Sequence, residues 1–215
     1  MAKLTDYFEE TRVIAIIRGI PSEKCVQTAE ALYEGGIRLV EVTFQLNKPD
    51  SWVETSDSIK AIKKTMGNEM CVGAGTVTST ELVDLSYAAG AEFIVSPNTE
   101  ESIIRKTKEL GMYSFPGAMT PSEVVKAHNA GADYVKLFPA ANLGCNYIKA
   151  IKSPLSNIGI IAVGGVNEKN ASEFINAGAF GVGVGGNLVN KSWISNGQYY
   201  LISKTAKELI SNIKR

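Results

Sequence analysis

Short β-rich segments alternate with amphipathic helical segments along the 215 residues of the chain, and this alternation constrains the fold more than any other feature. The helical segments end in a recurring signature, in which a glycine follows the last helical turn at Gly90, Gly111, Gly131 and Gly178. Glycine readily adopts the left-handed conformation that ends a helix before the chain enters the next strand. The first three of these glycines lie about 20 residues apart, the period of a short helix–strand unit.

The alternation predicts eight strands with helices between them. The predicted strands span residues 13–18, 39–44, 71–77, 93–97, 112–116, 134–139, 158–163 and 181–185. Eight such units favour an α/β fold in which residues 1–215 form a single (β/α)8 TIM barrel, with an open doubly wound sheet as the alternative. The segment Asp6-Tyr7-Phe8 indicates a short N-terminal helix that closes the bottom of the barrel.

Two helix starts carry capping signals. Thr78 with Glu81 predicts a capping box, in which the two side chains satisfy backbone N–H groups at the helix start. Thr120, Pro121 and Glu123 predict a second helix start, with an N-cap hydroxyl, a proline in the first turn and a glutamate three residues after the cap.

Composition excludes several functional classes. Lys+Arg and Asp+Glu balance at 22 each, so electrostatics support neither a nucleic-acid partner nor a membrane surface. No apolar stretch reaches membrane-spanning length and the N-terminus is polar, which predicts a cytoplasmic protein. The odd, widely spaced Cys25, Cys71 and Cys145 argue against a disulfide framework or a zinc site. His128 is the only histidine and is expected at the surface or a helix end, so no histidine metal site is expected.

Polar residues and glycines fall at the C-terminal ends of the predicted strands, where (β/α)8 barrels carry their active sites. Arg18 ends the first strand, Thr76 lies at the end of the third, and Pro97 ends the fourth. Within the centres of the predicted strands, the only charged residues are Glu41 and Lys136.

Lys136 lies in the otherwise apolar strand 134–139, on the same face as Tyr134 and Phe138. Burial lowers the pKa of a lysine, and a neutral amine attacks carbonyl carbons. Glu41 shares the inward face of its own strand with Thr43. The alternatives are an exposed strand face or a structural buried ion pair. Charges at a barrel mouth favour catalysis, in which Lys136 forms a Schiff base with a ketone and Glu41 transfers protons.

Two glycine pairs, Gly164-Gly165 and Gly185-Gly186, follow the seventh and eighth predicted strands. Barrels of this class commonly bind phosphate there through backbone N–H groups, and tight packing of the last strand is the alternative explanation. Residues 181–186 also match the dinucleotide-binding pattern G-x-G-x-x-G, but no second strand–helix–strand unit follows, so the match is taken as accidental.

The motifs taken together resemble those of the bacterial 2-keto-3-deoxy-6-phosphogluconate (KDPG) and 4-hydroxy-2-oxoglutarate (KHG) aldolases. The resemblance covers nearly the whole chain and rests on Glu41-Val42-Thr43, Gly73-Ala74-Gly75-Thr76-Val77, Phe93-Ile94-Val95-Ser96-Pro97, Phe115-Pro116-Gly117, Thr120-Pro121-Ser122-Glu123, Lys136-Leu137-Phe138-Pro139 and Gly164-Gly165-Val166. It implies a class I lyase with a trimeric (β/α)8 fold.

The resemblance also implies roles. Lys136 would be the Schiff-base lysine and Glu41 the general acid/base; Thr76 would contact the pyruvyl carboxylate, Pro97 and Phe138 would line the pocket, and Gly164, Gly165, Gly185 and Gly186 would hold the phosphate. No cofactor or metal is expected, and the partners would be small molecules and two further copies of the chain. The expected reaction is cleavage of KDPG to pyruvate and glyceraldehyde 3-phosphate, with cleavage of KHG to pyruvate and glyoxylate as a second activity.

Three departures from the family pattern bear on the substrate. Gln45 stands where many members carry an arginine that binds the substrate carboxylate, so Arg18 is expected to supply that cation. Val163 stands where many members have threonine, as in the branch that acts on the galactonate epimer. Gly186 stands in place of a frequent serine in the phosphate loop, leaving backbone donors and Asn187. The departures leave a galactonate-specific aldolase as one alternative. Two others remain: a sugar-phosphate isomerase or epimerase that uses Glu41 without a covalent lysine, and a catalytically silent phospho-ligand sensor.

Overall fold

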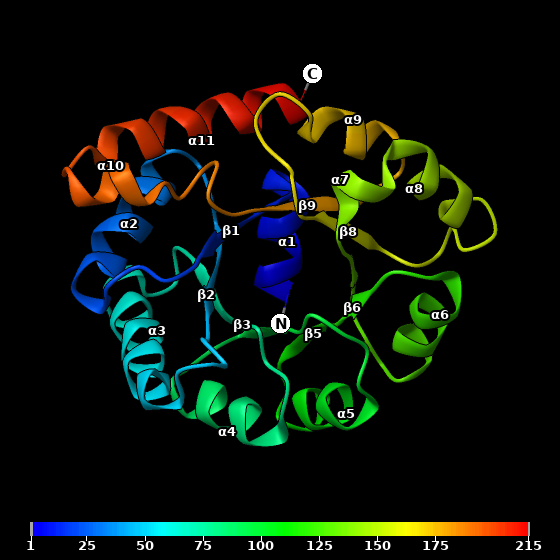
Figure 1. Ribbon diagram of the computed structural model, residues 1–215, viewed down its shortest axis with the longest axis horizontal. Coiled ribbons are helices and arrows are strands. Elements are labelled where there is room, and N and C mark those ends of the chain that lie inside the picture. Colours follow the sequence, from blue (N-terminus) through cyan, green and yellow to red (C-terminus); the bar gives the residue numbers. More distant parts are fainter. Residues whose placement is uncertain (1, 215) are drawn as a thin grey trace.

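The computed structural model describes residues 2–214 and shows a nearly closed barrel of parallel strands inside a ring of helices (Figure 1). The strands are β1 Val13–Ile17, β2 Leu39–Thr43, β3 Cys71–Gly75, β4 Phe93–Val95, β5 Tyr113–Phe115, β6 Gly117–Ala118, β7 Val135–Leu137, β8 Ile160–Val163 and β9 Gly181–Val184. The helices are α1 Ala2–Thr11, α2 Ser22–Glu34, the 3-10 helix η1 Pro49–Ser51, α3 Trp52–Met66, α4 Thr80–Ala88, α5 Glu101–Glu109, α6 Pro121–Asn129, α7 Ala140–Leu143, α8 Cys145–Lys152, α9 Ala171–Asn176, α10 Lys191–Ser195 and α11 Tyr199–Ile213.

The predicted TIM barrel is confirmed and the open doubly wound sheet is wrong. The strands pair in the order β5-β4-β3-β2-β1-β9-β8-β7-β6, and each of these pairs is parallel. Every predicted strand is present, with ends that lie one or two residues inside most of the predicted bounds.

The predicted strand 112–116 is present as β5, and the sequence missed the short strand β6 that follows directly after Pro116. Proline has no N–H to donate to a neighbouring strand, so regular pairing stops there. Since β5 and β6 stand at opposite ends of the strand order, the chain itself closes the barrel at this residue. Gly117 fits directly after the break because a Cβ there would overlap the carbonyl oxygen of Pro97.

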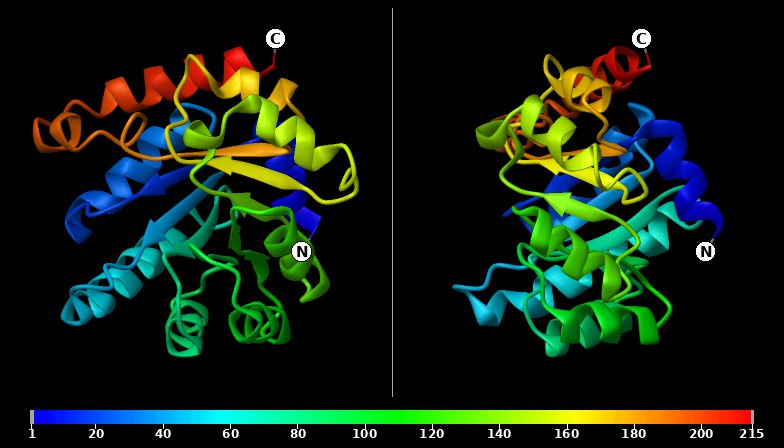
Figure 2. Two further views of the ribbon diagram at one scale, coloured as in Figure 1. Left: turned by 45° about the vertical axis from the view of Figure 1, so that its right-hand side comes forward. Right: turned by 90° about the vertical axis from the view of Figure 1, so that its right-hand side faces the viewer.

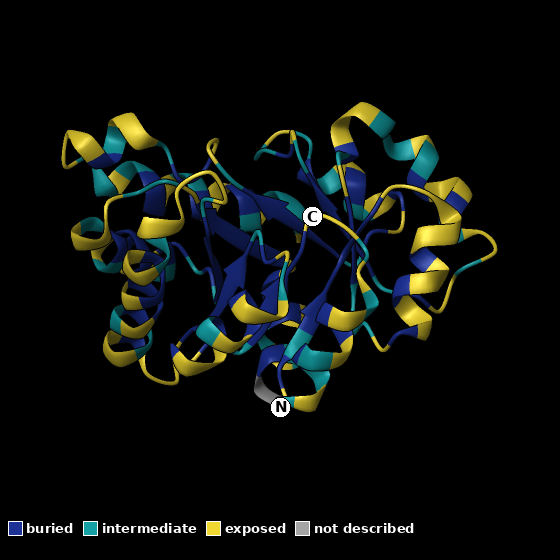
Figure 3. Ribbon diagram, turned by 60° about the horizontal axis from the view of Figure 1, so that its bottom comes forward, coloured by how far each residue is buried: buried dark blue, intermediate teal, exposed yellow. Residues whose placement is uncertain are grey.

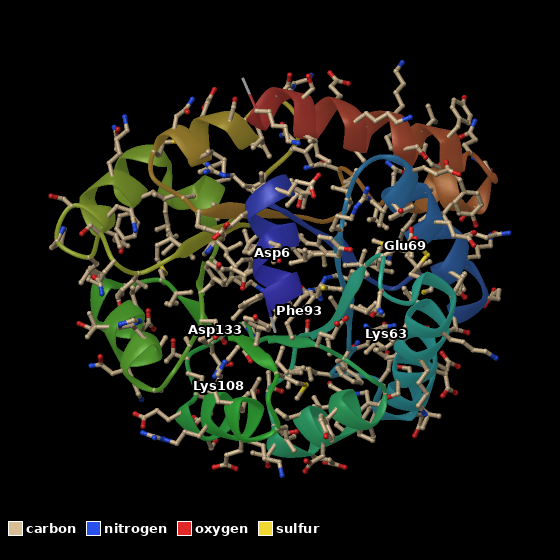
Figure 4. The ribbon with its side chains drawn as sticks, turned by 180° about the vertical axis from the view of Figure 1, so that it is seen from behind. Asp6, Lys63, Glu69, Phe93, Lys108 and Asp133 are labelled. Atoms are coloured by element: carbon tan, nitrogen blue, oxygen red, sulfur yellow. The ribbon has the colours of Figure 1, made fainter. Side chains whose placement is uncertain are left out.

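The predicted N-terminal helix is α1, and it covers the bottom of the barrel, at the opposite end from the loops that follow the strands (Figure 2). Phe8 of this helix is fully buried and packs edge-on against Tyr134 and Phe180, with ring centroids 5.1 Å away in both cases. The view from behind shows α1 across the barrel, with Lys108 and Asp133 close together beside it (Figure 4). These two side chains form an ion pair of 2.7 Å.

Burial follows the two faces of each strand. Buried strands lie inside a ring of helices whose outer faces are exposed (Figure 3). Side chains pointing into the barrel, such as Leu39, Phe93 and Ile161, form one apolar cluster, while those pointing outward pack against the helices in a second and larger cluster. In β2, Val40 and Val42 belong to the helix-facing cluster, as alternation predicted.

The helix ends confirm most of the local predictions. Gly90, Gly111, Gly131 and Gly178 all have positive φ angles, between 75° and 106°. Thr120 and Glu123 form the predicted capping box. The prediction for Thr78 is wrong: α4 begins one residue later than expected, and the side chain of Ser79 accepts the hydrogen bond from the N–H of Leu82.

The remaining composition-based predictions concern the surface and the cysteines. His128 is exposed in the last turn of α6, as expected. All three cysteines are free. Within residues 2–214, no helix is long and apolar enough to cross a membrane, and no group of three or more His, Cys, Asp or Glu side chains is placed to hold a metal ion.

Candidate active site

A pocket of about 400 Å³ lies at the C-terminal ends of the strands, where a barrel of this class carries its chemistry. Nine of the ten residues that the sequence nominated line it: Arg18, Thr76, Pro97, Lys136, Phe138, Gly164, Gly165, Gly185 and Gly186. The tenth, Glu41, is buried within the barrel, with 2% of its surface exposed.

Lys136 occupies the middle of β7, and its side chain is 6% exposed. Its ammonium nitrogen lies 5.2 Å from the ring centroid of Phe138, which forms part of the pocket wall. Burial lowers the pKa of Lys136 below the ordinary value of a lysine; the charge of Glu41 opposes this shift and that of Arg18 adds to it. The amine is therefore deprotonated at lower pH than a surface lysine, as a nucleophile requires.

Glu41 lies in β2 and carries an oxygen, Oε1, that is buried and has no hydrogen-bond partner in the described part of the chain. Burial raises the pKa of its carboxyl group, while the charges of Lys136 and Arg18 lower it. Glu41 and Lys136 shift each other's pKa, but they form no direct ion pair, which a purely structural role would favour. A buried carboxyl group left without a partner is costly, and such groups concentrate at functional sites.

Gly75 makes room for Glu41. It faces the carboxyl group from the end of β3, and a Cβ there would overlap Oε1 of Glu41. Glycine at this position therefore allows the carboxylate to lie between β2 and β3.

Arg18 and Thr76 are brought together across the mouth of the barrel. The guanidinium Nη2 of Arg18 donates a hydrogen bond of 3.3 Å to the hydroxyl of Thr76. Thr76 has a φ of 60°, a left-handed conformation that is unfavourable for a branched side chain and that recurs at functional sites. The pair presents a cation and a hydroxyl to the pocket, which suits a carboxylate.

The glycine loops present backbone donors. The N–H groups of Gly165, Val166, Gly186 and Asn187 make no hydrogen bond to any other described group, and all four residues line the pocket. Gly164 and Gly165 have φ angles of 98° and 75°, so glycine is required by conformation there. Successive unpaired N–H groups in such turns bind anions, phosphate in particular.

Five further residues line the pocket that were not nominated as site residues from the sequence: Ile16, Val163, Val166, Gly183 and Asn187. Apolar residues at strand ends look like core residues, so only the barrel register identifies them as pocket wall. Gln45 is absent from the lining of this pocket. It lines a small separate cavity beside Thr43, and its backbone carbonyl accepts a hydrogen bond from the indole N–H of Trp52.

Comparison with known proteins gives a consistent result. Residues 4–205 match the family model described as KDPG and KHG aldolase. A 2-dehydro-3-deoxy-6-phosphogalactonate aldolase of Escherichia coli is 39% identical, over 82% of this chain and 83% of that protein. The KHG/KDPG aldolase of the same species is 31% identical, over 94% and 92%. A solved KDPG aldolase from Legionella pneumophila, with pyruvate captured as a covalent carbinolamine intermediate, is 28% identical with a TM-score of 0.84, over 94% of this chain and 96% of that chain.

The resemblance noted from the motifs is thereby confirmed, and it agrees with a barrel whose mouth holds a buried lysine and glycine loops with unpaired N–H groups. The chain belongs to the KDPG and KHG aldolase family of lyases.

Proposed function

We propose that this protein is a class I aldolase that cleaves a 2-keto-3-deoxy-6-phospho sugar acid through a Schiff base on Lys136. The observation that carries the proposal is the buried Lys136 amine, which opens into a pocket lined by anion-binding groups and has its pKa lowered by burial. The carbinolamine in the Legionella relative supports it, since an amine adding to the ketone of pyruvate gives that species.

In cleavage, Lys136 attacks the C2 ketone of the substrate, and loss of water gives a protonated imine. Glu41 removes the proton of the C4 hydroxyl, directly or through water, and the C3–C4 bond breaks. The bonding electrons pass into the imine, giving an enamine and releasing the aldehyde, glyceraldehyde 3-phosphate. Protonation of the enamine at C3 and hydrolysis of the imine then release pyruvate and restore the amine.

The two anionic ends of the substrate match the two polar regions of the pocket. The carboxylate next to the ketone would bind Arg18 and Thr76, which are joined by a hydrogen bond near Lys136. The phosphate at the far end would bind the unpaired N–H groups of the two glycine loops. The intervening hydroxyl groups would lie against Val163 and Phe138.

We infer that the galactonate epimer is the better substrate, ahead of the gluconate epimer that the sequence motifs first favoured. Val163 gives the pocket an apolar wall where many family members have a threonine hydroxyl, and the more similar of the two E. coli relatives carries the galactonate name. Without the threonine hydroxyl, the site cannot form a hydrogen bond that would favour the hydroxyl configuration of the gluconate epimer. The ratio of kcat/KM for the two epimers measures this preference, and a ratio favouring gluconate would reverse the inference.

Borohydride trapping tests the central proposal. Incubation with pyruvate and borohydride should add the mass of the reduced adduct to the peptide that contains Lys136, and exhaustive treatment with EDTA should leave cleavage activity intact. Lys136→Met should abolish the adduct. A protein that stays unlabelled, or that is labelled on another lysine, would contradict the Schiff-base mechanism and favour a non-covalent isomerase or a silent sensor. Activity lost to EDTA and restored by a divalent ion would indicate a metal-dependent aldolase instead.

A further inference from the structure

A side pocket of about 280 Å³ opens beside the main pocket, between the loops that follow β1 and β9. The two pockets share Ile16, Arg18 and Gly186, so they adjoin at the barrel mouth. Lys191 lines only the side pocket. Within the described residues, neither pocket is lined by an aspartate or a glutamate, so nothing in their walls neutralises the cations.

The backbone of Lys191 is fixed by local structure, and its side chain is exposed. It is the first residue of α10, directly after Asn190, whose side chain caps this helix by accepting hydrogen bonds from two N–H groups. Its ammonium group reaches across to the loop after β1, where a Cβ on Gly19 would lie only 2.9 Å from Nζ. Gly19 also has a φ of 60°, so its conformation and the space beside it both suit glycine.

The Lys191 ammonium group has no partner among the described residues. It makes no ion pair or hydrogen bond with any of residues 2–214. A lysine on a protein surface usually points into solvent, but this one is directed over a backbone loop beside a pocket that already contains Arg18. Two cations at one rim, with no carboxylate in the lining, create a positive potential that attracts an anion.

The glycine loop beside Lys191 lacks a charge of its own. Gly186 has no side chain, and its unpaired N–H and that of Asn187 are neutral donors. Arg18 is engaged with Thr76, on the side of the mouth where the carboxylate would bind. A phosphate with nearly two negative charges is bound more strongly when a cation adds to neutral donors.

We propose that Lys191 binds the phosphate of the substrate and sets the preference for phosphorylated over unphosphorylated substrates. The inference rests on the proposed function, because it assumes that a phosphorylated keto acid occupies the main pocket. It adds to the glycine loops a charged side chain that approaches from the β1 side.

The experiment compares the wild-type protein with Lys191→Met, Lys191→Arg and the control Lys207→Met, a substitution of an exposed lysine on α11. Two quantities are measured: kcat/KM for the phosphorylated keto acid, and the rate of imine formation with pyruvate, which carries no phosphate. Lys191→Met should lower kcat/KM by roughly ten- to a hundredfold, the effect of losing one charge-assisted contact. Imine formation should stay within about twofold, because the pyruvate end of the site is untouched.

Lys191→Arg should retain most of the activity because it keeps the charge, and Lys207→Met should match the wild type. Weaker inhibition of Lys191→Met by inorganic phosphate would support the same assignment. If Lys191→Met matches the wild type, or loses imine formation and cleavage equally, the proposal is overturned. If the wild type itself forms no imine with pyruvate, it is the proposed function that fails.

Discussion

Two buried groups of the candidate site, Lys136 and Glu41, shift each other's pKa, and the charge of Arg18 acts on both. Burial lowers the pKa of Lys136 and raises that of Glu41, which favours the neutral form of each group. The negative charge of Glu41 raises the pKa of Lys136 and the positive charge of Arg18 lowers it. The fraction of Lys136 present as the free amine therefore depends on both neighbours, and their removal should have opposite effects.

This opposition gives a prediction about pH dependence. Glu41→Gln removes a carboxylate that stabilises the ammonium form, so the pKa of Lys136 should fall and the acid limb of imine formation with pyruvate should move to lower pH. Arg18→Ala removes a cation that destabilises the ammonium form, so the limb should move to higher pH. Rates of trapping by borohydride across the pH range measure both shifts. Shifts in the same direction would show that Lys136 responds to something other than these charges.

A second residue-scale prediction concerns Gly75, whose missing side chain leaves room for Oε1 of Glu41. Gly75→Ala should displace the carboxylate and lower kcat by about a hundredfold or more, the usual contribution of a positioned acid/base. In a Glu41→Gln background the same substitution should add little, because the group it displaces is already inactive. Additive losses in the double variant would mean that Gly75 acts on the fold and not through Glu41.

These residues differ in how far the sequence could predict them. Lys136 and Glu41 could be identified because a charge within an apolar strand is conspicuous. The role of Gly75 could not, since it depends on how closely the Glu41 side chain of β2 approaches the backbone of β3. Gln45 shows the converse: its place in the motif suggested a residue of the main pocket, but it lines a separate cavity.

At the scale of elements, periodicity predicted which helices and strands are present, and local hydrogen bonds decide where each one begins. Residues 78–80 are three consecutive hydroxyl residues, Thr-Ser-Thr, each of which can cap a helix. The sequence pattern favoured Thr78 because Glu81 follows three residues later, whereas the backbone places the Ser79 hydroxyl against the N–H of Leu82. Pro116 likewise ends β5 where the sequence predicted, but the pairing of Gly117–Ala118 as a separate strand, β6, was not predicted because two residues carry no periodic pattern.

The assignment of the cap leads to a stability prediction with its own control. Ser79→Ala should lower the free energy of unfolding by about 1 kcal/mol, because the N–H of Leu82 loses its acceptor. Thr78→Ala, at an exposed neighbour, should change it by less than about 0.5 kcal/mol. Urea unfolding of the two variants measures the difference. A larger loss for Thr78→Ala would restore the capping box that the sequence suggested.

At the scale of the whole molecule, the barrel separates stability from function. The bottom is closed by α1 and its aromatic contacts, and the mouth carries the strained Thr76, the unpaired N–H groups and the buried charges. The sequence could predict this division because helix-ending glycines and strand-ending polar residues repeat along the chain. It could not predict that Ile16, Val166 and Gly183 also line the pocket, because that depends on the register of the closed barrel.

The last prediction is that the protein is a homotrimer, an expectation that comes from the family resemblance. Large apolar side chains exposed on neighbouring elements are consistent with an interface: Met119 after β6, Val125 on α6 and Phe138 after β7 are 48%, 37% and 42% exposed. Light scattering should give three times the chain mass of 23.1 kDa. Met119→Asp should shift the protein toward monomers, because a carboxylate would be buried unpaired in the interface. The matched Val53→Asp, at a 67% exposed residue of α3, should leave the mass unchanged. A monomeric wild-type protein would contradict the prediction, and a trimer unaffected by Met119→Asp would place the interface elsewhere.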